Sequence, residues 1–265
     1  MIFHSASQYC YNWLESQPCV KEESITDWLL YYISTQSDKI VYKAFNRKEE
    51  AFNGSDWEWW ILTDTYAFRF LIQAKKLKEN ADNYPNLSYN NRRGMQIDLL
   101  INSAFEKSAM PFYAFYSCQK PELEKQIKNI SYIDESVLKW CKPCINGCFL
   151  SSAFWIKEKV LDAPKKSIYA IELLNASFGI SIFDYNTSIS MEKVTDLLLN
   201  VDSYYRNQIG NKKGNAHLLQ ELPNYVRVLI GNKNNKQQSL SWYESEFHND
   251  LSSLSGVSII DLRNR

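Results

Sequence analysis

Residues 54–75 read GSDWEWWILTDTYAFRFLIQAK, and this stretch decides the fold. Two arms rich in aromatic and aliphatic residues flank Asp64-Thr65, a pair that suits the centre of a tight hairpin turn. A turn at that pair fixes the register, because the residue numbers of every facing pair then add up to 129. The register therefore predicts that Asp56 lies directly opposite Gln73.

The same register sorts the side chains of the hairpin onto two faces. Alternation along the strands gives one apolar face, made of Trp57, Trp59, Ile61, Phe68, Phe70 and Ile72. The other face is polar and carries Asp56, Glu58, Arg69, Gln73 and Lys75. Charged side chains normally avoid sheet interiors, so we expect a function at the end where Asp56 meets Gln73.

The neighbouring segments complete a mixed α/β pattern. Apolar residues at helical spacing, with acidic residues in the first turn, predict a helix over 22–36. The segment KIVYKAF at 39–45 predicts a strand, GMQIDLLINSAFEK at 94–107 a helix, and MPFYAFY at 110–116 a further strand. The predicted order is helix, three strands, helix and strand.

This order, with an Asp at the start of the second strand and Gln73-Ala74-Lys75 on the third, resembles the PD-(D/E)XK nuclease superfamily. More narrowly, it resembles the Mrr-like restriction endonucleases, which use a Q-x-K variant. The resemblance covers about residues 22–117. It implies a restriction-endonuclease-like αβββαβ core, in which helices flank a mixed central sheet.

The resemblance also implies a metal-dependent endonuclease that cleaves nucleic acid, DNA first, in bacterial restriction or anti-phage defence. Its cofactor would be Mg²⁺ or Mn²⁺. In addition to nucleic acid, the expected partners are a second copy of the chain or another protein of a defence system. The alternative is a nuclease-like fold without catalysis that binds nucleic acid or a protein.

The resemblance assigns a role to each matching residue. Asp56 becomes a metal ligand, Gln73 occupies the second motif position, and Lys75 positions or activates water. A carboxylate on the first helix contributes too, either Glu23 or Glu22, and periodicity favours Glu22 for facing the core.

The chemistry of phosphodiester hydrolysis calls for a hard cation, which prefers carboxylate oxygens. Because Gln73 is neutral, we expect a second acid to compensate, either Glu58 beside Asp56 or Glu50 in the preceding loop. The candidate nucleic-acid contacts are Lys76 and Arg69.

Composition limits the other classes of function. The 30 basic residues balance the 30 acidic ones, so any contact with nucleic acid must be local. The sequence has no glycine-rich phosphate loop, and its three histidines are widely separated, which gives a histidine-based triad little support. With no apolar run of roughly 18 residues and no basic leader, we expect a cytoplasmic chain without a membrane partner.

The cysteines offer a competing zinc site. Cys141, Cys144 and Cys148 follow one another closely, and Cys118 could complete a tetrahedron. Zinc ribbons pair two C-x-x-C knuckles, whereas this sequence has one, so we predict thiols and no structural zinc.

The rest of the chain extends the predicted core. We expect a nuclease-like core over 1–160 and a C-terminal α/β extension over 161–265, which could pack on the core as one domain. CFLSSAFWIKEKV at 148–160 is predicted to be helical, and YVRVLI at 225–230 to be a strand. By analogy alone, the extension would carry target recognition.

Overall fold

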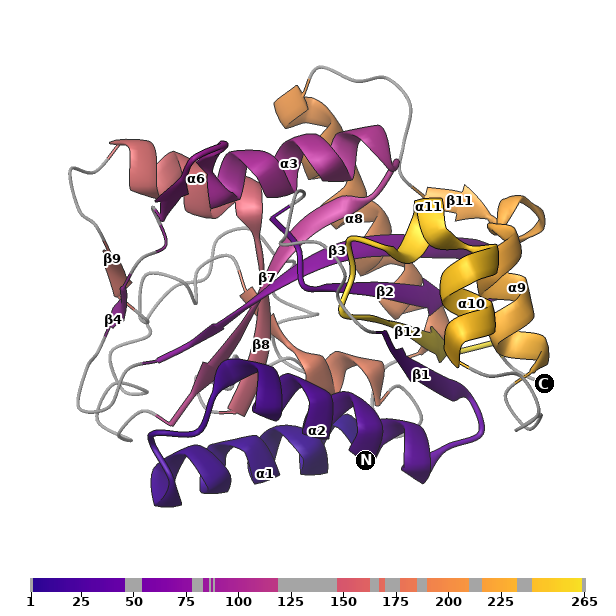
Figure 1. The fold of residues 1–265 in the computed structure, drawn as a ribbon, viewed down its shortest axis with the longest axis horizontal. Helices are drawn as coiled ribbons and strands as arrows, with labels where there is room; N and C mark the ends of the chain where they lie inside the picture. Colours follow the sequence, from indigo (N-terminus) through magenta and orange to yellow (C-terminus); the bar gives the residue numbers. More distant parts are fainter. Residues whose placement is uncertain are drawn as a thin grey trace.

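A mixed β-sheet forms the centre of the structure, a computed structural model (Figure 1). The strand order is β1-β12-β2-β3-β7-β8-β10, and β11 also pairs with β3. The structure describes residues 2–45, 54–77, 83–85, 87, 89–118, 147–162, 167–169, 177–184, 190–209, 216–232 and 240–263. The sheet strands are β1 (Ile40–Ala44), β2 (Trp57–Leu62), β3 (Tyr66–Lys76), β7 (Met110–Ser117), β8 (Gly147–Ser152), β10 (Ser177–Gly179), β11 (Ala216–Leu218) and β12 (Gly256–Asp261).

Helices cover both faces of this sheet, which confirms the predicted mixed α/β fold. In Figure 1, α1 and α2 run along one side, and α3 and α6 lie on the opposite side. The helices are α1 (Ile2–Ser16), α2 (Glu22–Gln36), α3 (Gln96–Glu106), α6 (Ala153–Asp162), α8 (Met191–Ile209), α9 (Asn224–Gly231), α10 (Leu240–Glu246) and α11 (His248–Leu251). Two short 3₁₀ turns add η2 (Ile180–Phe183) and η3 (Leu219–Glu221), and two strand pairs lie apart from the sheet: β4 (Asn83–Pro85) with β9 (Ser167–Tyr169), and β5 (Asn90–Asn91) with β6 (Gly94–Met95).

The β2–β3 hairpin has the predicted register. Trp57 faces Ile72 and Leu62 faces Ala67, so every facing pair matches the sequence-based assignment. The Thr63 N–H donates to the Tyr66 carbonyl at 2.8 Å and closes the turn around Asp64-Thr65. The turn prediction therefore fixed the faces of both strands correctly.

Two hydrophobic cores lie on the two sides of the sheet. Trp57, Trp59 and Phe70 pack with α1 and α2 on one side. Trp60 and Leu71 pack with α3, α6 and α9 on the other. Each core buries the apolar stripe of its helices, which is the main source of stability for elements of this length.

The C-terminal segment enters the sheet next to its edge strand β1. Strand β12 pairs in parallel with β2 and antiparallel with β1, so it separates two strands that are close in sequence. The sheet therefore contains residues from both the predicted core and the predicted C-terminal extension.

The predicted order of helix, three strands, helix and strand is present as α2, β1, β2, β3, α3 and β7, with the short strands β4, β5 and β6 between β3 and α3. Two predictions were wrong. Residues 225–230 lie in helix α9, because the apolar side chains of Tyr225, Val226 and Leu229 recur at helical spacing and are buried on one face. Residues 147–152 form strand β8 and the helix begins only at Ala153. No helix in the described ranges is long and apolar enough to cross a membrane.

Candidate active site

Asp56 lies directly before β2 and is held there by its own backbone. Its N–H donates to the Ile72 carbonyl at 2.8 Å, which extends the hairpin ladder by one residue. Its carbonyl accepts from the Ser255 N–H, also at 2.8 Å, in the segment that leads into β12. The C-terminal part of the chain therefore helps to position Asp56.

The Asp56 carboxylate meets Gln73, as the register predicted. Gln73 Nε2 donates to Asp56 Oδ2 at 2.5 Å, and the Ala74 N–H donates to the same oxygen at 3.2 Å. Gln96, the first residue of α3, donates from Nε2 to Gln73 Oε1 at 2.9 Å. Gln96 thus joins the start of α3 to the site, and it was not among the residues predicted from the sequence.

Gly54 allows α3 to approach this end of the hairpin. Its φ of +69° lies in the left-handed region, which favours glycine. A Cβ at this position would lie 2.5 Å from the Gln96 carbonyl oxygen and 2.7 Å from the Leu100 nitrogen. Gly54 therefore permits close packing against the helix that carries Gln96.

Lys75 and Glu22 face each other beside Asp56. Lys75 Nζ lies 3.9 Å from Glu22 Oε1, and the Lys76 N–H donates to Glu22 Oε2 at 3.0 Å. Burial raises the pKa of the Glu22 carboxyl; Lys75 opposes this rise, and the Asp56 charge adds to it. Glu22, at the first turn of α2, is therefore the helix carboxylate in electrostatic contact with Asp56 and Lys75.

The other predicted ligands and contacts take different positions. Glu23 is exposed on α2, next to Glu22 in sequence. Lys76 Nζ donates to the carbonyls of Pro18 and Val20, each at 2.6 Å, and so ties the α1–α2 connection to the end of β3. Glu50 lies outside the described residues.

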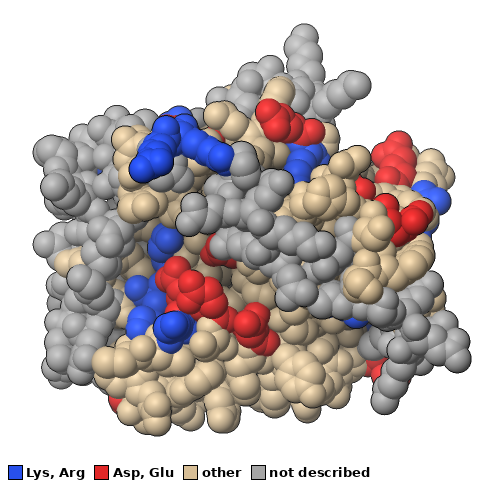
Figure 2. Space-filling view, viewed as in Figure 1, with Lys and Arg blue, Asp and Glu red and all other residues tan. Residues whose placement is uncertain are grey.

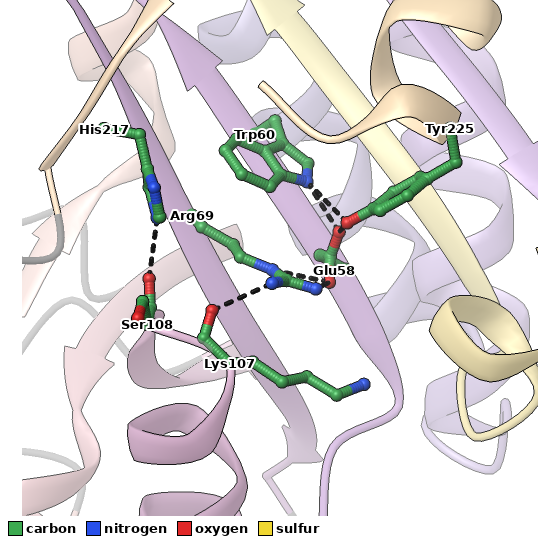
Figure 3. A network of polar contacts seen from close by, with 7 residues as sticks. All are labelled: Glu58, Trp60, Arg69, Lys107, Ser108, His217 and Tyr225. Atoms are coloured by element: carbon green, nitrogen blue, oxygen red, sulfur yellow. Dashed lines mark hydrogen bonds and ion pairs between the residues drawn. The ribbon is translucent and has the colours of Figure 1, made fainter. Parts of the chain in front are cut away.

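Glu58 and Arg69 form a buried ion pair on the same face of the hairpin (Figure 3). Glu58 is fully buried, and its Oε2 accepts from Arg69 Nε at 2.9 Å and from Nη2 at 2.7 Å. Its Oε1 accepts from Trp60 Nε1 at 2.6 Å and from the Tyr225 hydroxyl. Both carboxylate oxygens are thus used inside the protein, and we leave Glu58 and Arg69 out of the proposed site.

Residues at the end of α3 also contact this ion pair. The Lys107 carbonyl accepts from Arg69 Nη1 at 2.8 Å, and His217 Nε2 lies 2.8 Å from the Ser108 carbonyl (Figure 3). Burial lowers the pKa of the Lys107 amine, and Glu58 opposes this change. The cluster therefore joins α3, α9, β11 and the hairpin, which gives it a structural role.

The remaining sequence hypotheses fall partly outside the described residues. Cys141 and Cys144 are not described, whereas Cys148 is buried in β8 and its N–H donates to the Ser7 hydroxyl at 2.9 Å. Trp57 and Trp59 are buried, as predicted, and so is Trp60.

The site offers two carboxylates and an amide to a cation. Where the chain is described, no three His, Cys, Asp or Glu side chains group together as a metal site. Magnesium needs fewer protein ligands, because it retains several waters and commonly uses one or two carboxylates. Asp56 and Glu22 fit that requirement. On the face of the molecule drawn in Figure 2, acidic and basic side chains meet beside a hollow in the surface.

The orientation of the Gln73 amide determines whether Gln73 can bind a cation. In this structure its nitrogen faces Asp56 and its oxygen faces Gln96. To share a cation with Asp56, the amide must rotate so that Oε1 faces Asp56. Gln96 can follow by the same rotation, because a primary amide has a donor at one end and an acceptor at the other.

Fold and site together define a mixed α/β protein with an acid, amide and lysine cluster at the open end of its central hairpin. Residues 1–261 match the model of a family described as "Family of unknown function (DUF6615)", and the chain belongs to that family. No curated protein and no solved structure matches it.

Proposed function

We propose that this protein is a metal-dependent endonuclease of the PD-(D/E)XK type that hydrolyses phosphodiester bonds in nucleic acid, DNA first. The observation that carries the proposal is the hydrogen bond between Gln73 and Asp56, with Lys75 and Glu22 beside it. These residues come from two strands and a helix, so their meeting depends on the fold. We place the activity in the cytoplasm, in restriction or anti-phage defence.

Each residue has a role in this proposal. Asp56 and Glu22 would hold Mg²⁺ or Mn²⁺, and the ion when bound would neutralise phosphate charge and lower the pKa of a water molecule. Lys75 contributes a positive charge that stabilises the negative charge developing on the phosphate. Gln96 holds the amide of Gln73, and the Ala74 N–H fixes one oxygen of Asp56.

The second candidate is a catalytically inactive module that binds nucleic acid or a protein partner. One observation favours it: the neutral amide of Gln73 donates to Asp56, so it uses an oxygen that a cation would need. The two candidates differ in whether the Asp56 charge is required for bond cleavage.

A cleavage assay separates them. The wild-type chain is incubated with single- and double-stranded DNA and RNA, with Mg²⁺, Mn²⁺ or a chelator. We expect metal-dependent cleavage by the wild type and none by Asp56→Asn. Asp64→Asn makes the same change at the exposed turn of the same hairpin and should cleave as the wild type does. Absence of wild-type cleavage on all substrates would favour the binding module.

A further inference from the structure

A small hairpin with two arginines precedes α3. Strands β5 and β6 pair Asn91 with Gly94, so Arg92 and Arg93 form the two-residue turn, and both are exposed. Tyr89, just before β5, is 53% exposed. An exposed aromatic ring and two exposed guanidinium groups within five residues are a combination that suits nucleic acid, because the ring can stack on a base and arginine pairs with phosphate oxygens.

The base of this hairpin is attached to the candidate active site. The Gln96 N–H donates to the Tyr89 carbonyl at 2.9 Å, and Gln96 Nε2 donates to Gln73 at 2.9 Å. Arg93 lies three positions before Gln96, so their Cα atoms are at most about 11 Å apart. The turn therefore lies close to the residues that would cut the substrate.

The local charge suits a phosphate backbone. The acidic residue in the first turn of α3, Asp98, pairs with Lys157 on α6 at 2.5 Å. Lys157 thus offsets the charge of Asp98, and the turn itself carries two exposed cationic residues, Arg92 and Arg93. Figure 2 shows a group of basic side chains near the start of α3, on the same face as the hollow. On a chain with no net charge, such a group supplies the local positive field that a polyanion requires.

We propose that residues 89–95 bind a single-stranded segment of nucleic acid, with Arg92 and Arg93 on its phosphates and Tyr89 stacked on an unpaired base. The statement that residues 89–95 bind next to a cleavage site rests on the proposed function. Binding of a single strand by these residues does not require cleavage.

Binding is measured by fluorescence anisotropy with the full-length chain and labelled single-stranded DNA and RNA oligonucleotides in chelator. We expect Arg92→Ala/Arg93→Ala to weaken binding about tenfold or more. The slope of log K against log salt should fall by about 1.4, because each lost phosphate contact on a single strand lowers it by about 0.7. Arg92→Lys/Arg93→Lys keeps both charges and should retain most of the affinity.

A matched control removes two exposed positive charges elsewhere. Lys193 lies on α8 and Arg227 on α9, and Lys193→Ala/Arg227→Ala should leave both the affinity and the salt slope unchanged. Tyr89→Ala should weaken binding about tenfold, and Tyr89→Phe should bind as the wild type does, since phenylalanine retains the stacking surface.

The hairpin proposal is overturned if Arg92→Ala/Arg93→Ala binds single strands as tightly as the control and with the same salt slope. Cleavage by the wild type is read separately. Cleavage together with unchanged binding by the arginine variant would leave the proposed function intact and remove the hairpin contact. Loss of binding by that variant, without any wild-type cleavage, would support the contact and remove the endonuclease.

Discussion

Two polar clusters lie on the same face of one hairpin, yet they differ in what covers them. Glu58 is fully buried, and all its oxygens are bonded within the protein. Asp56, two residues earlier, is only partly buried and lies beside Lys75 and Glu22. The alternation of side chains along a strand places both acids on the same face and does not predict this difference in burial. Glu58 also accepts from the hydroxyl of Tyr225 on α9, a contact from a distant part of the chain.

The largest expected effect is on stability, at the closed cluster. Arg69→Met leaves the Glu58 charge buried without its partner, and should lower the free energy of unfolding by about 3–5 kcal/mol. Urea denaturation measures this loss. Replacing both residues, as in Glu58→Leu/Arg69→Met, removes the charge as well and should cost less than Arg69→Met alone. A larger loss in the double variant would contradict the assigned ion pair.

Lys75→Ala should reduce cleavage strongly and stability only slightly. We expect the cleavage rate to fall by about 10²-fold, because the positive charge beside the reacting phosphate is lost. Stability should change by about 1 kcal/mol or less, since the 3.9 Å pair with Glu22 is partly exposed. Lys193→Ala, at an exposed position, should change neither quantity. Equal rates for the two variants would remove Lys75 from the mechanism.

Gln73→Glu sharpens the role of the neutral amide. The new carboxylate would lie against Asp56 Oδ2, which now accepts from the Gln73 amide at 2.5 Å, so repulsion should destabilise the metal-free chain. A bound cation would relieve that repulsion. We therefore expect a larger rise in melting temperature with Mg²⁺ for this variant than for the wild type. Identical shifts would indicate that position 73 does not face the cation.

The smallest effect is the pH dependence that Glu22 contributes. Its pKa is raised in the folded chain, so between the ordinary and the raised value the folded state holds a proton that the unfolded state has released. Stability from this group therefore falls as the pH rises through that window. Mg²⁺ affinity should change in the opposite sense and weaken as the pH falls, because a protonated carboxyl cannot bind the ion. Glu22→Gln should flatten both profiles.

Much of the hairpin could be predicted from the sequence, because Asp64-Thr65 sets the register locally. That register also makes Glu58 and Arg69 diagonal neighbours on one face, a geometry in which opposite charges pair. From the sequence, Glu58 was predicted to be a metal ligand and Arg69 a nucleic-acid contact. The ion pair was therefore predictable from the sequence. The contact between Glu58 and Tyr225 was not, since Tyr225 lies 167 residues further along the chain.

Long-range packing explains the other omissions. Strand β12 enters between β1 and β2 from the far end of the chain, and no local pattern gives its place in the sheet. Helix α9 was predicted to be a strand, because its short apolar run fits either structure until burial on one face is known. Gln96 joins the site only because α3 packs on Gly54.

The central claim is that one hairpin face carries a catalytic end and a structural end. The most direct test measures both cleavage and unfolding for Asp56→Asn and Tyr225→Phe. We predict that Asp56→Asn loses cleavage and keeps its unfolding free energy within about 1 kcal/mol, because asparagine retains an oxygen acceptor for the Ala74 N–H. Tyr225→Phe should keep cleavage and lose about 1–2 kcal/mol, because the Glu58 carboxylate loses a donor. An Asp56→Asn variant that cleaves at the wild-type rate would contradict the account.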